Sequence, residues 1–255
     1  MCFDVDSRPP ITPIAGGALD SQELTLTAAD GTRFSAFKAR AAAPSGAGMI
    51  VLPDVRGLHA YYEELALRFA EAGIDAVAID YFGRTAGLGR RANDFEFMPH
   101  VDQTTPGGLT ADITAAANEL HRDGRVRALF AVGFCFGGRL AFLTPTLGLG
   151  VAGGIGFYGW PTGPARNDTP APAEVAGQID GAILGIFGGA DQGINAGAVE
   201  EFRKALATAD VEHELVTYPG APHSFFDRKA DAFAEQSADA WRKVLEFVRS
   251  HTPAA

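Results

Sequence analysis

The segment ALFAVGFCFGGRLAFL, residues 128–143, joins an apolar run to a helix-like run through a cysteine flanked by glycines. Gly133 and Gly137 lie two residues to either side of Cys135, which is the spacing of a sharp strand-to-helix turn that holds a nucleophile above the edge of a sheet. The helix that follows directs its free N–H groups at the thiol, and that end of a helix favours a thiolate and a developing oxyanion. The segment therefore predicts a nucleophilic cysteine in an α/β fold, the alternative being a small side chain that only packs.

Short apolar runs alternate with helix-like segments along the rest of the chain. The expected strands cover residues 48–53, 74–79, 128–134, 151–157, 182–187 and 212–218. The expected helices cover residues 61–72, 109–123, 196–209 and 230–249. Continuously apolar strands that alternate with helices indicate a mostly parallel sheet with helices on both faces. Two alternating segments, 23–27 and 32–38, flank Ala29-Asp30-Gly31 and predict an antiparallel hairpin at one edge of the sheet.

The remaining segments define the outline of the domain. Residues 1–20 contain several prolines and glycines, and we expect them to form an extended N-terminal arm. Residues 84–108 form a long polar loop, and loops of that length often serve as lids or binding loops. Because 47% of the 255 residues are hydrophobic and no internal repeat or second core is seen, residues 1–255 are expected to form a single domain.

Charge and cysteine content argue against several classes of protein. The formal net charge of -10 disfavours a nucleic-acid binder, which needs basic surface, and disfavours binding to anionic membranes. The two cysteines, Cys2 and Cys135, do not make a disulfide framework, and the N-terminus lacks the pattern of a signal peptide. We therefore expect a cytoplasmic protein, a monomer or a small homo-oligomer, with Cys135 reduced. The histidines other than His223 show no metal-ligand spacing, so no metal site is expected.

Two residues that could activate Cys135 follow later strands. Asp191 comes after the run 182–187, and His223 comes after the run that ends at residue 218. The carboxyl ends of parallel strands share one edge of a sheet, so the three side chains are expected to meet there as a triad. His223 would take the thiol proton and later protonate the leaving group, while Asp191 would hold the imidazole tautomer. Taken singly, Asp191 could be a turn residue and His223 a surface histidine.

An oxyanion hole needs two backbone donors beside the nucleophile. The N–H of Phe136, next to Cys135, is one expected donor, and the loop after residue 53 is expected to supply the other, at Val55. Tyr81 and Trp160 also follow expected strands and reach the same edge, where they could line a pocket or simply pack.

Four segments, GFCFGG, GGADQ, PGAPHSF and LPDVRGLHAYYEELALRFAEAGIDAVAIDYFGR, together resemble the dienelactone hydrolase (carboxymethylenebutenolidase) family, from about residue 20 to residue 250. The resemblance implies an α/β-hydrolase fold that uses neither cofactor nor metal and that opens an unsaturated lactone ring. It maps the nucleophile, acid and base of the family onto Cys135, Asp191 and His223, and the oxyanion donors onto Val55 and Phe136.

Two features depart from the family pattern. Catalytic members carry a glutamate that contacts the resting thiol, and the matching position here holds Asp54, which is one methylene shorter. Members also bind the carboxylate of the substrate with two arginines. The resemblance places one near Arg228 and the other in the long loop, at Arg84, Arg90 or Arg91. If neither arginine lies at the site, the substrate need not be a dienelactone.

Three functions are compatible with these patterns. The first is a cysteine-nucleophile hydrolase that cleaves a small lactone or ester through an acyl-enzyme. The second keeps the triad but acts on a broader range of carboxylic esters or thioesters. The third is a catalytically silent protein that uses the same fold to bind a ligand or a partner, because a fold does not by itself specify a function. The intact set of cysteine, histidine and aspartate favours the first two.

Overall fold

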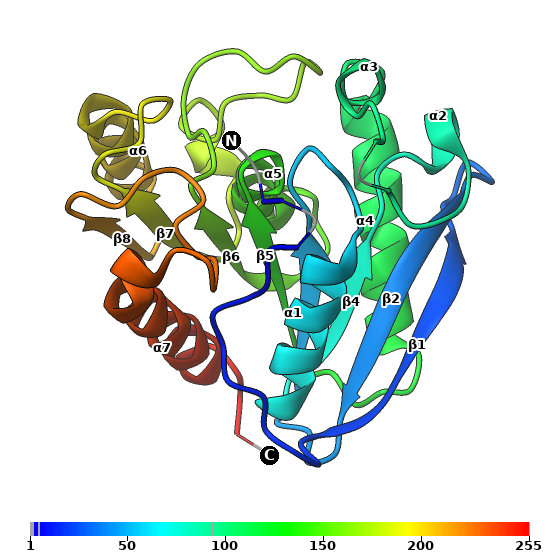
Figure 1. The fold of residues 1–255 in the computed structure, drawn as a ribbon. Coiled ribbons are helices and arrows are strands. Elements are labelled where there is room, and N and C mark those ends of the chain that lie inside the picture. The colour runs from blue at the N-terminus through cyan, green and yellow to red at the C-terminus, as the bar shows by residue number, and fades with distance from the viewer. Residues whose placement is uncertain (1–2, 5, 93, 255) are drawn as a thin grey trace.

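The computed structural model of the protein describes residues 3–4, 6–92 and 94–254. At their centre is an eight-stranded sheet with the order β1-β2-β4-β3-β5-β6-β7-β8 (Figure 1). The strands are β1 (Ala18–Thr27), β2 (Arg33–Ala41), β3 (Ala47–Leu52), β4 (Asp75–Ile79), β5 (Ala128–Phe134), β6 (Val151–Phe157), β7 (Ala182–Gly188) and β8 (His213–Tyr218). β2 pairs antiparallel with β1 and with β4, and the other neighbouring strands are parallel. The predicted mostly parallel sheet with an antiparallel hairpin at one edge is therefore confirmed.

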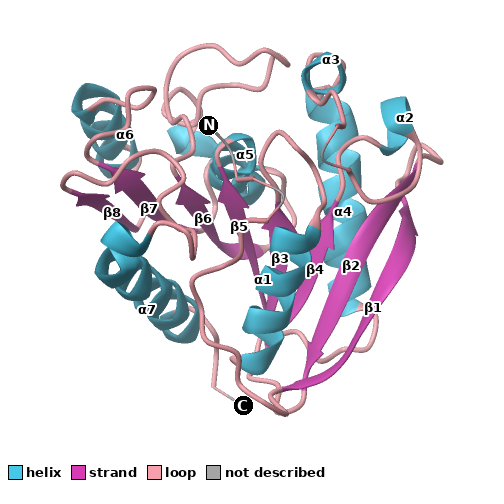
Figure 2. Cartoon of the chain, in the orientation of Figure 1, coloured by secondary structure: helices cyan, strands magenta, loops and turns pink. Residues whose placement is uncertain are grey.

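Helices cover both faces of the sheet (Figure 2). They are α1 (Ala60–Glu71), α2 (Gly83–Ala86), α3 (Met98–Val101), α4 (Pro106–His121), α5 (Phe136–Leu143), α6 (Ala196–Thr208) and α7 (Ala234–Ser250), with short 3-10 turns at Thr144–Thr146, Ala176–Gln178 and Asp231–Phe233. In Figure 2, α1 and α7 lie in front of the sheet, and α4 and α5 lie behind it. Phe69 of α1 and Val244 of α7 belong to one apolar cluster, and Leu109 and Ile113 of α4 belong to the other. Every residue of β3, β4, β5 and β7 is buried, as their continuous apolar runs predict.

The long loop expected over residues 84–108 is partly helical. It contains most of α2 and all of α3, and α4 begins before its end. Thr105 caps α4 by accepting the N–H of Gly108 at 3.1 Å, and Pro106 occupies the first helical turn, where its missing N–H costs no hydrogen bond. Met98 and Val101 of α3 reach the cavity beside Cys135, so this loop helps to enclose the site.

The N-terminal arm is docked on the domain, although its composition suggests a loose extended segment. β1 begins at Ala18, so the arm is shorter than the expected residues 1–20. Phe3 is buried, and its ring stacks on Tyr61 of α1 with 3.9 Å between the ring centroids. Ser7 Oγ donates a hydrogen bond to Asp227 Oδ2 at 2.6 Å, which ties the arm to the loop that follows β8. Cys2 lies outside the described residues.

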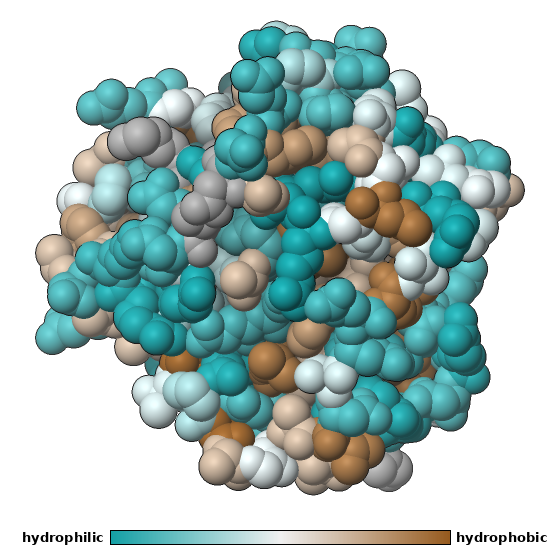
Figure 3. Space-filling view, turned by 45° about the vertical axis from the view of Figure 1, so that its right-hand side comes forward, coloured by the Kyte–Doolittle hydropathy of each residue, from teal (hydrophilic) through white to brown (hydrophobic). Residues whose placement is uncertain are grey.

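The face of the molecule in Figure 3 is mostly hydrophilic, with hydrophobic residues scattered among polar ones. Scattered apolar residues of this kind are ordinary for a protein surface. Within the described parts of the chain, none of the helices combines the length and the apolar character that crossing a bilayer requires.

Candidate active site

Cys135 occupies a sharp turn between β5 and α5. Its backbone has a φ of 56° and a ψ of -112°, a left-handed conformation that is strained for a residue with a side chain. A Cβ atom on Gly133 would lie 1.8 Å from the carbonyl oxygen of Gly137, and one on Gly137 would lie 2.1 Å from the carbonyl oxygen of Leu52. Gly133 is therefore required for the turn to close, and Gly137 is required for the close approach of the turn to the end of β3.

His223 and Asp191 form a hydrogen-bonded pair at the same edge of the sheet. His223 Nδ1 lies 2.6 Å from Asp191 Oδ2. The other oxygen, Asp191 Oδ1, accepts the N–H groups of Gly193 at 2.8 Å and Ile194 at 3.2 Å. Burial would raise the pKa of Asp191, but the hydrogen bond and charge of His223 and the two amides outweigh it, so the pKa is lowered. Asp191 is thus held as an acceptor for the N–H of the imidazole.

The second ring nitrogen of His223 is available for proton transfer. Its Nε2 is buried and has no hydrogen-bond partner within the described residues. The ring lies between aromatic neighbours, with its centroid 4.8 Å from that of Tyr158 and 5.0 Å from that of Trp160. Since Nδ1 faces Asp191, the tautomer that donates to the carboxylate leaves a lone pair on Nε2. This arrangement can act as a base toward a thiol.

A cavity of about 280 Å³ opens beside Cys135. It brings together Cys135, Val55, Phe136 and Trp160, all of which the sequence placed at this edge. Trp160 Nε1 donates to the carbonyl of Gly193 at 3.2 Å, so its ring is fixed between the cavity and the Asp191 turn. Val55 and Phe136, the two predicted oxyanion donors, line the same cavity as Cys135 and come from different chain segments.

Asp54 is a buried carboxylate held by backbone amides. Its Oδ1 accepts the N–H of Arg56 at 2.8 Å, and its Oδ2 accepts the N–H of Phe3 at 3.1 Å. The N–H of Asp54 itself donates to the hydroxyl of Tyr62 at 2.9 Å. Burial raises the pKa of Asp54 to about 6, although the hydrogen bonds from Arg56 and Phe3 oppose the shift. The N-terminal arm therefore takes part in orienting this carboxylate, which the sequence did not indicate.

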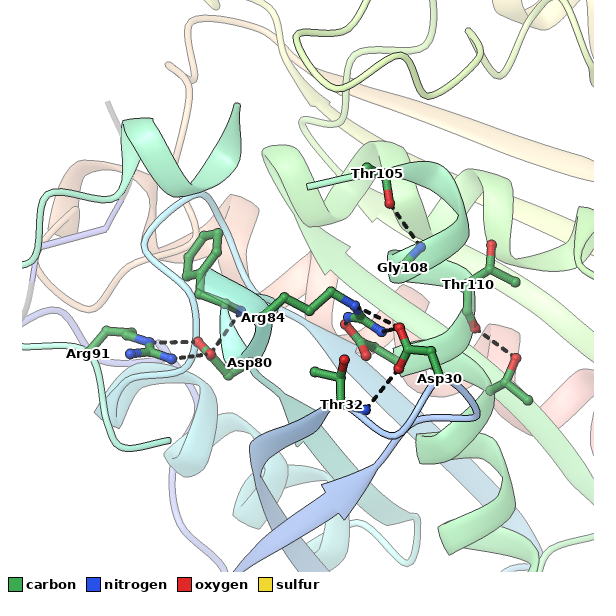
Figure 4. Close-up of polar contacts among 11 residues, drawn as sticks. Asp30, Thr32, Asp80, Arg84, Arg91, Thr105, Gly108 and Thr110 are labelled. Carbon is green, nitrogen blue, oxygen red and sulfur yellow. Dashed lines mark hydrogen bonds and ion pairs between the residues drawn. The ribbon is translucent and has the colours of Figure 1, made fainter. Parts of the chain in front are cut away.

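The arginines expected to bind a substrate carboxylate lie elsewhere. Arg84 donates to Asp112 Oδ2 at 2.5 Å. It also donates to Asp30 Oδ2 at 2.8 Å (Figure 4). Arg91 is buried against Asp80, and Arg90 pairs with Glu23 and Glu63. None of these three arginines is among the described residues that line the cavity.

Two further residues predicted for the pocket are also set back from it. Arg228 Nη2 donates to Glu64 Oε1 at 2.9 Å, beside the docked arm. Tyr81 is buried, and its hydroxyl donates to the carbonyl of Pro53 at 2.9 Å. Its ring packs edge-on against Phe136 with 5.3 Å between the centroids, so Tyr81 supports the wall from behind.

Much of the cavity wall comes from residues that the sequence analysis did not single out. Arg139, Arg166, Asn167 and Thr169 line it together with Met98 and Val101. Arg139 lies four residues after Cys135, so helical spacing alone could have placed it on the face next to the thiol. The segment after β6 gives no such signal, because a loop has no periodicity that fixes where its side chains point.

Comparisons with known proteins agree with this architecture. The model of the dienelactone hydrolase family matches residues 34–252. A candidate carboxymethylenebutenolidase of Escherichia coli is 27% identical over 259 residues, which cover 95% of this chain and 94% of that protein. A candidate 2-oxo-3-(5-oxofuran-2-ylidene)propanoate lactonase of Bradyrhizobium sp is 30% identical over 211 residues, which cover 80% of this chain and 83% of that protein.

A solved structure extends the likeness to three dimensions. The crystal structure of a candidate dienelactone hydrolase from Klebsiella pneumoniae subsp. pneumoniae matches with a TM-score of 0.77 and 26% identity, covering 90% of this chain and 99% of that one. The sheet order, the hairpin at its edge and this match confirm the predicted α/β-hydrolase fold. Because the family model spans most of its length, this chain belongs to the dienelactone hydrolase family and is a hydrolase of that type.

Proposed function

We propose that this protein hydrolyses small lactones or esters through an acyl-enzyme formed on Cys135, with His223 and Asp191 completing the triad. The observation that carries the proposal is the 2.6 Å contact between His223 Nδ1 and Asp191 Oδ2, which leaves Nε2 without a partner in the described residues. The glycine-flanked turn at Cys135 supports it, and so do the carboxymethylenebutenolidase and lactonase names of the relatives.

Acylation would begin with transfer of the Cys135 Sγ proton to His223 Nε2. The thiolate attacks the carbonyl carbon, and the C=O electron pair moves to the oxygen, which the N–H groups of Phe136 and Val55 stabilise. When the intermediate collapses, the carbon–oxygen bond to the leaving group breaks and His223 gives its proton to that oxygen. In a lactone the released hydroxyl stays attached to the acyl group. Asp191 keeps the imidazole oriented and stabilises its cationic form.

Deacylation would use the same groups on a water molecule. His223 Nε2 takes one proton from water, and the hydroxide attacks the thioester carbon. The carbon–sulfur bond then breaks, and the departing thiolate recovers the proton from His223. One water is consumed, a carboxylic acid is released, and Cys135 returns to its starting state.

A broader carboxylesterase or thioesterase is the second candidate. The pairing of Arg84 with Asp112 and of Arg228 with Glu64, both outside the cavity, favours it over an enzyme restricted to dienelactones. A binding protein without catalysis is the least favoured reading, because the His223–Asp191 pair and the strained cysteine turn have no evident use in a silent fold.

The proposal is tested with p-nitrophenyl acetate, an activated ester that acylates a reactive thiol. We expect a burst of p-nitrophenol, a mass increase of one acetyl group on Cys135, and a loss of at least about 1,000-fold in kcat/KM for Cys135→Ala. His223→Gln should slow acylation while leaving the thiol in place. Equal rates for wild type and Cys135→Ala, or acetylation at another residue, would show that Cys135 is not the nucleophile.

A further inference from the structure

The cavity beside Cys135 is lined mainly by apolar side chains. These are Val55, Met98, Val101, Phe136, Leu140, Trp160, Pro164 and Ala165. The polar side chains of its wall, apart from the thiol, are Arg139, Arg166, Asn167 and Thr169. What the cavity can bind depends on whether those four still offer hydrogen bonds or charge to a ligand.

The side chains of Asn167 and Thr169 form hydrogen bonds with each other and with a neighbouring loop. Asn167 Nδ2 donates to Thr104 Oγ1 at 3.0 Å. Thr169 Oγ1 donates to Asn167 Oδ1 at 2.9 Å. Both side chains are buried, so these hydrogen bonds are shielded from water. They join the loop after β6 to the end of α3 and do not require a ligand to complete them.

The guanidinium of Arg139 donates hydrogen bonds to the backbone of the loop after β6. Its Nη2 donates to the carbonyls of Gly163 and Thr169, both at 2.9 Å. Its Nη1 donates to the carbonyls of Trp160 and Thr162, both at 3.4 Å. The remaining nitrogen, Nε, is buried and has no hydrogen-bond partner among the described residues. The guanidinium thus closes the loop around itself and would have to give up carbonyl partners in order to bind a carboxylate.

Arg166 is paired across the mouth of the cavity. Its Nε and Nη2 contact the two oxygens of Asp102 at 2.6 Å and 3.0 Å. This fork geometry is the strongest way to pair an arginine with a carboxylate. The side chain is 65% exposed, so its charge lies at the rim, in water, and already has an anionic partner.

We propose that this site accepts esters and lactones whose acyl group is uncharged and apolar, and that it discriminates against acyl groups that carry a carboxylate. The inference rests on the proposed function and names its substrate class. A carboxylate inside the cavity would lose its hydration, and it would have to displace loop carbonyls from the Arg139 Nη atoms or Asp102 from Arg166, which is unfavourable. An alkyl chain would instead exchange water for contact with the apolar wall.

The size of the cavity limits the acyl group as well. A volume of about 280 Å³ is near the lower end of the ~300–1,000 Å³ that is usual for small-molecule sites. Short acyl chains and small lactone rings suit such a volume, whereas long lipid chains would extend past Met98 at the rim.

The test compares two esters that differ only at the end of the acyl chain. p-Nitrophenyl hexanoate ends in a methyl group, and the p-nitrophenyl monoester of adipic acid has the same number of carbons but ends in a carboxylate. We expect kcat/KM for the hexanoate to exceed that for the adipate ester by at least about 100-fold, since a site that leaves a polar group unpaired can discriminate that strongly. Each rate is corrected by the rate of the same ester with Cys135→Ala.

A matched pair of variants tests whether missing charge is the cause. Met98 lies at the rim and is 36% exposed, so Met98→Lys adds a cation there and Met98→Gln adds a polar group without charge. The ratio of adipate to hexanoate kcat/KM should rise about tenfold or more in Met98→Lys relative to Met98→Gln. An equal ratio in the two variants would count against the electrostatic explanation.

The outcomes separate this inference from the proposed function. If the adipate ester is hydrolysed as fast as the hexanoate in a reaction that needs Cys135, the cavity binds carboxylates and the inference is wrong, while the proposed function stands. A selective loss of adipate activity in Arg166→Gln would identify the cation responsible. If Cys135→Ala hydrolyses both esters like wild type, the proposed function fails and the inference fails with it.

Discussion

Two aspartates at the same edge of the sheet show how one kind of local structure can serve chemistry or architecture. Asp191 follows β7 and Asp80 follows β4. Each accepts two backbone N–H groups, those of Gly193 and Ile194 at Asp191 and those of Leu58 and Phe82 at Asp80. Each also pairs with one ionisable side chain, Asp191 with His223 at 2.6 Å and Asp80 with Arg91 at 2.6 Å, and Figure 4 shows the second pair. Both carboxylates are buried. Position and burial therefore do not distinguish them.

The difference lies in what the partner can still do. Arg91 has N–H donors and no acceptor atom, and besides Asp80 it donates to the carbonyls of Ala86 and Gly87 at 3.5 Å and 2.6 Å. The His223 imidazole has a second ring nitrogen that can accept or donate a hydrogen, and this Nε2 has no partner among the described residues. One pair locks a loop in place, and the other orients a group that can transfer a proton.

The largest expected effect on catalysis comes from replacing Asp191, the hydrogen-bond partner of His223. Asp191→Asn should lower kcat for p-nitrophenyl acetate by roughly 1,000- to 10,000-fold, because the amide favours the wrong imidazole tautomer. Urea unfolding of the same variant is the control, since the fold should be retained. A drop of less than tenfold would mean that Asp191 does not orient the base.

Breaking the Asp80–Arg91 pair should instead reduce stability. Arg91→Met leaves Asp80 buried without its cation and should cost about 3–5 kcal/mol in the free energy of unfolding, measured with urea. The folded fraction should keep its kcat. The double variant Asp80→Asn/Arg91→Met is the matched control and should recover part of the loss. If kcat falls as far as it does in Asp191→Asn, the two pairs are not separate in function.

Asp54 sharpens the comparison, because the contacts of its carboxylate described above are backbone amides, with no ion pair. Its pKa is raised from 3.8 to about 6 by burial, so the folded state holds the proton more tightly than the unfolded state. Stability from this group is therefore greatest at low pH and is lost as pH rises through the window from about 4 to about 6. At ~1.36 kcal/mol per pKa unit the loss is about 3 kcal/mol.

Asp54→Asn tests this directly. The unfolding free energy of the variant relative to wild type should increase by about 2–3 kcal/mol between pH 4 and pH 7. Asp112, whose pKa burial also raises to about 6, affects both proteins equally, so it cancels in this difference. Parallel pH curves for the two proteins would show that Asp54 does not titrate in this window.

The smallest effect is expected at an exposed pair of the same chemistry. Arg228 and Glu64 are in contact at 2.9 Å, but the arginine side chain is 55% exposed, and such pairs contribute about 0–1 kcal/mol. Arg228→Gln should therefore change stability by no more than that and should change kcat/KM for p-nitrophenyl hexanoate less than about twofold. A loss confined to the adipate ester would place Arg228 in contact with substrate after all.

The sequence indicates the fold and the triad positions because both depend on local or topological rules. Gly133 reflects a steric requirement within five residues of chain, because a Cβ atom there would clash with Gly137. The strands that precede Asp191 and His223 must end at a common edge. The expected strand and helix positions agree with the structure to within a few residues, apart from the short helices α2 and α3 and from β1, which begins at Ala18 and not at residue 23. The single-domain assignment and the catalytic roles remain predictions.

The side-chain partners of the arginines could not be predicted. Arg84 is satisfied by Asp30 and Asp112, which lie 54 and 28 residues away in sequence, and no local pattern encodes such pairs. The cavity wall after β6 was missed for a similar reason, because Arg139 reaches the carbonyls of a loop up to 30 residues further along. Charge pairing across the fold, more than the strand and helix pattern, decides which cations remain available to a substrate.

The docking of the N-terminal arm affects the order in which parts of the protein can fold during synthesis. Phe3 contacts Asp54 early in the chain, but Ser7 reaches Asp227 across 220 residues of sequence. During synthesis the arm must therefore wait for almost the whole chain before its final partners exist, and contacts of such long range form slowly. A ribosome-bound chain that ends before residue 227 would lack the residue that anchors the arm. One that ends before residue 223 would also lack the histidine of the proposed triad.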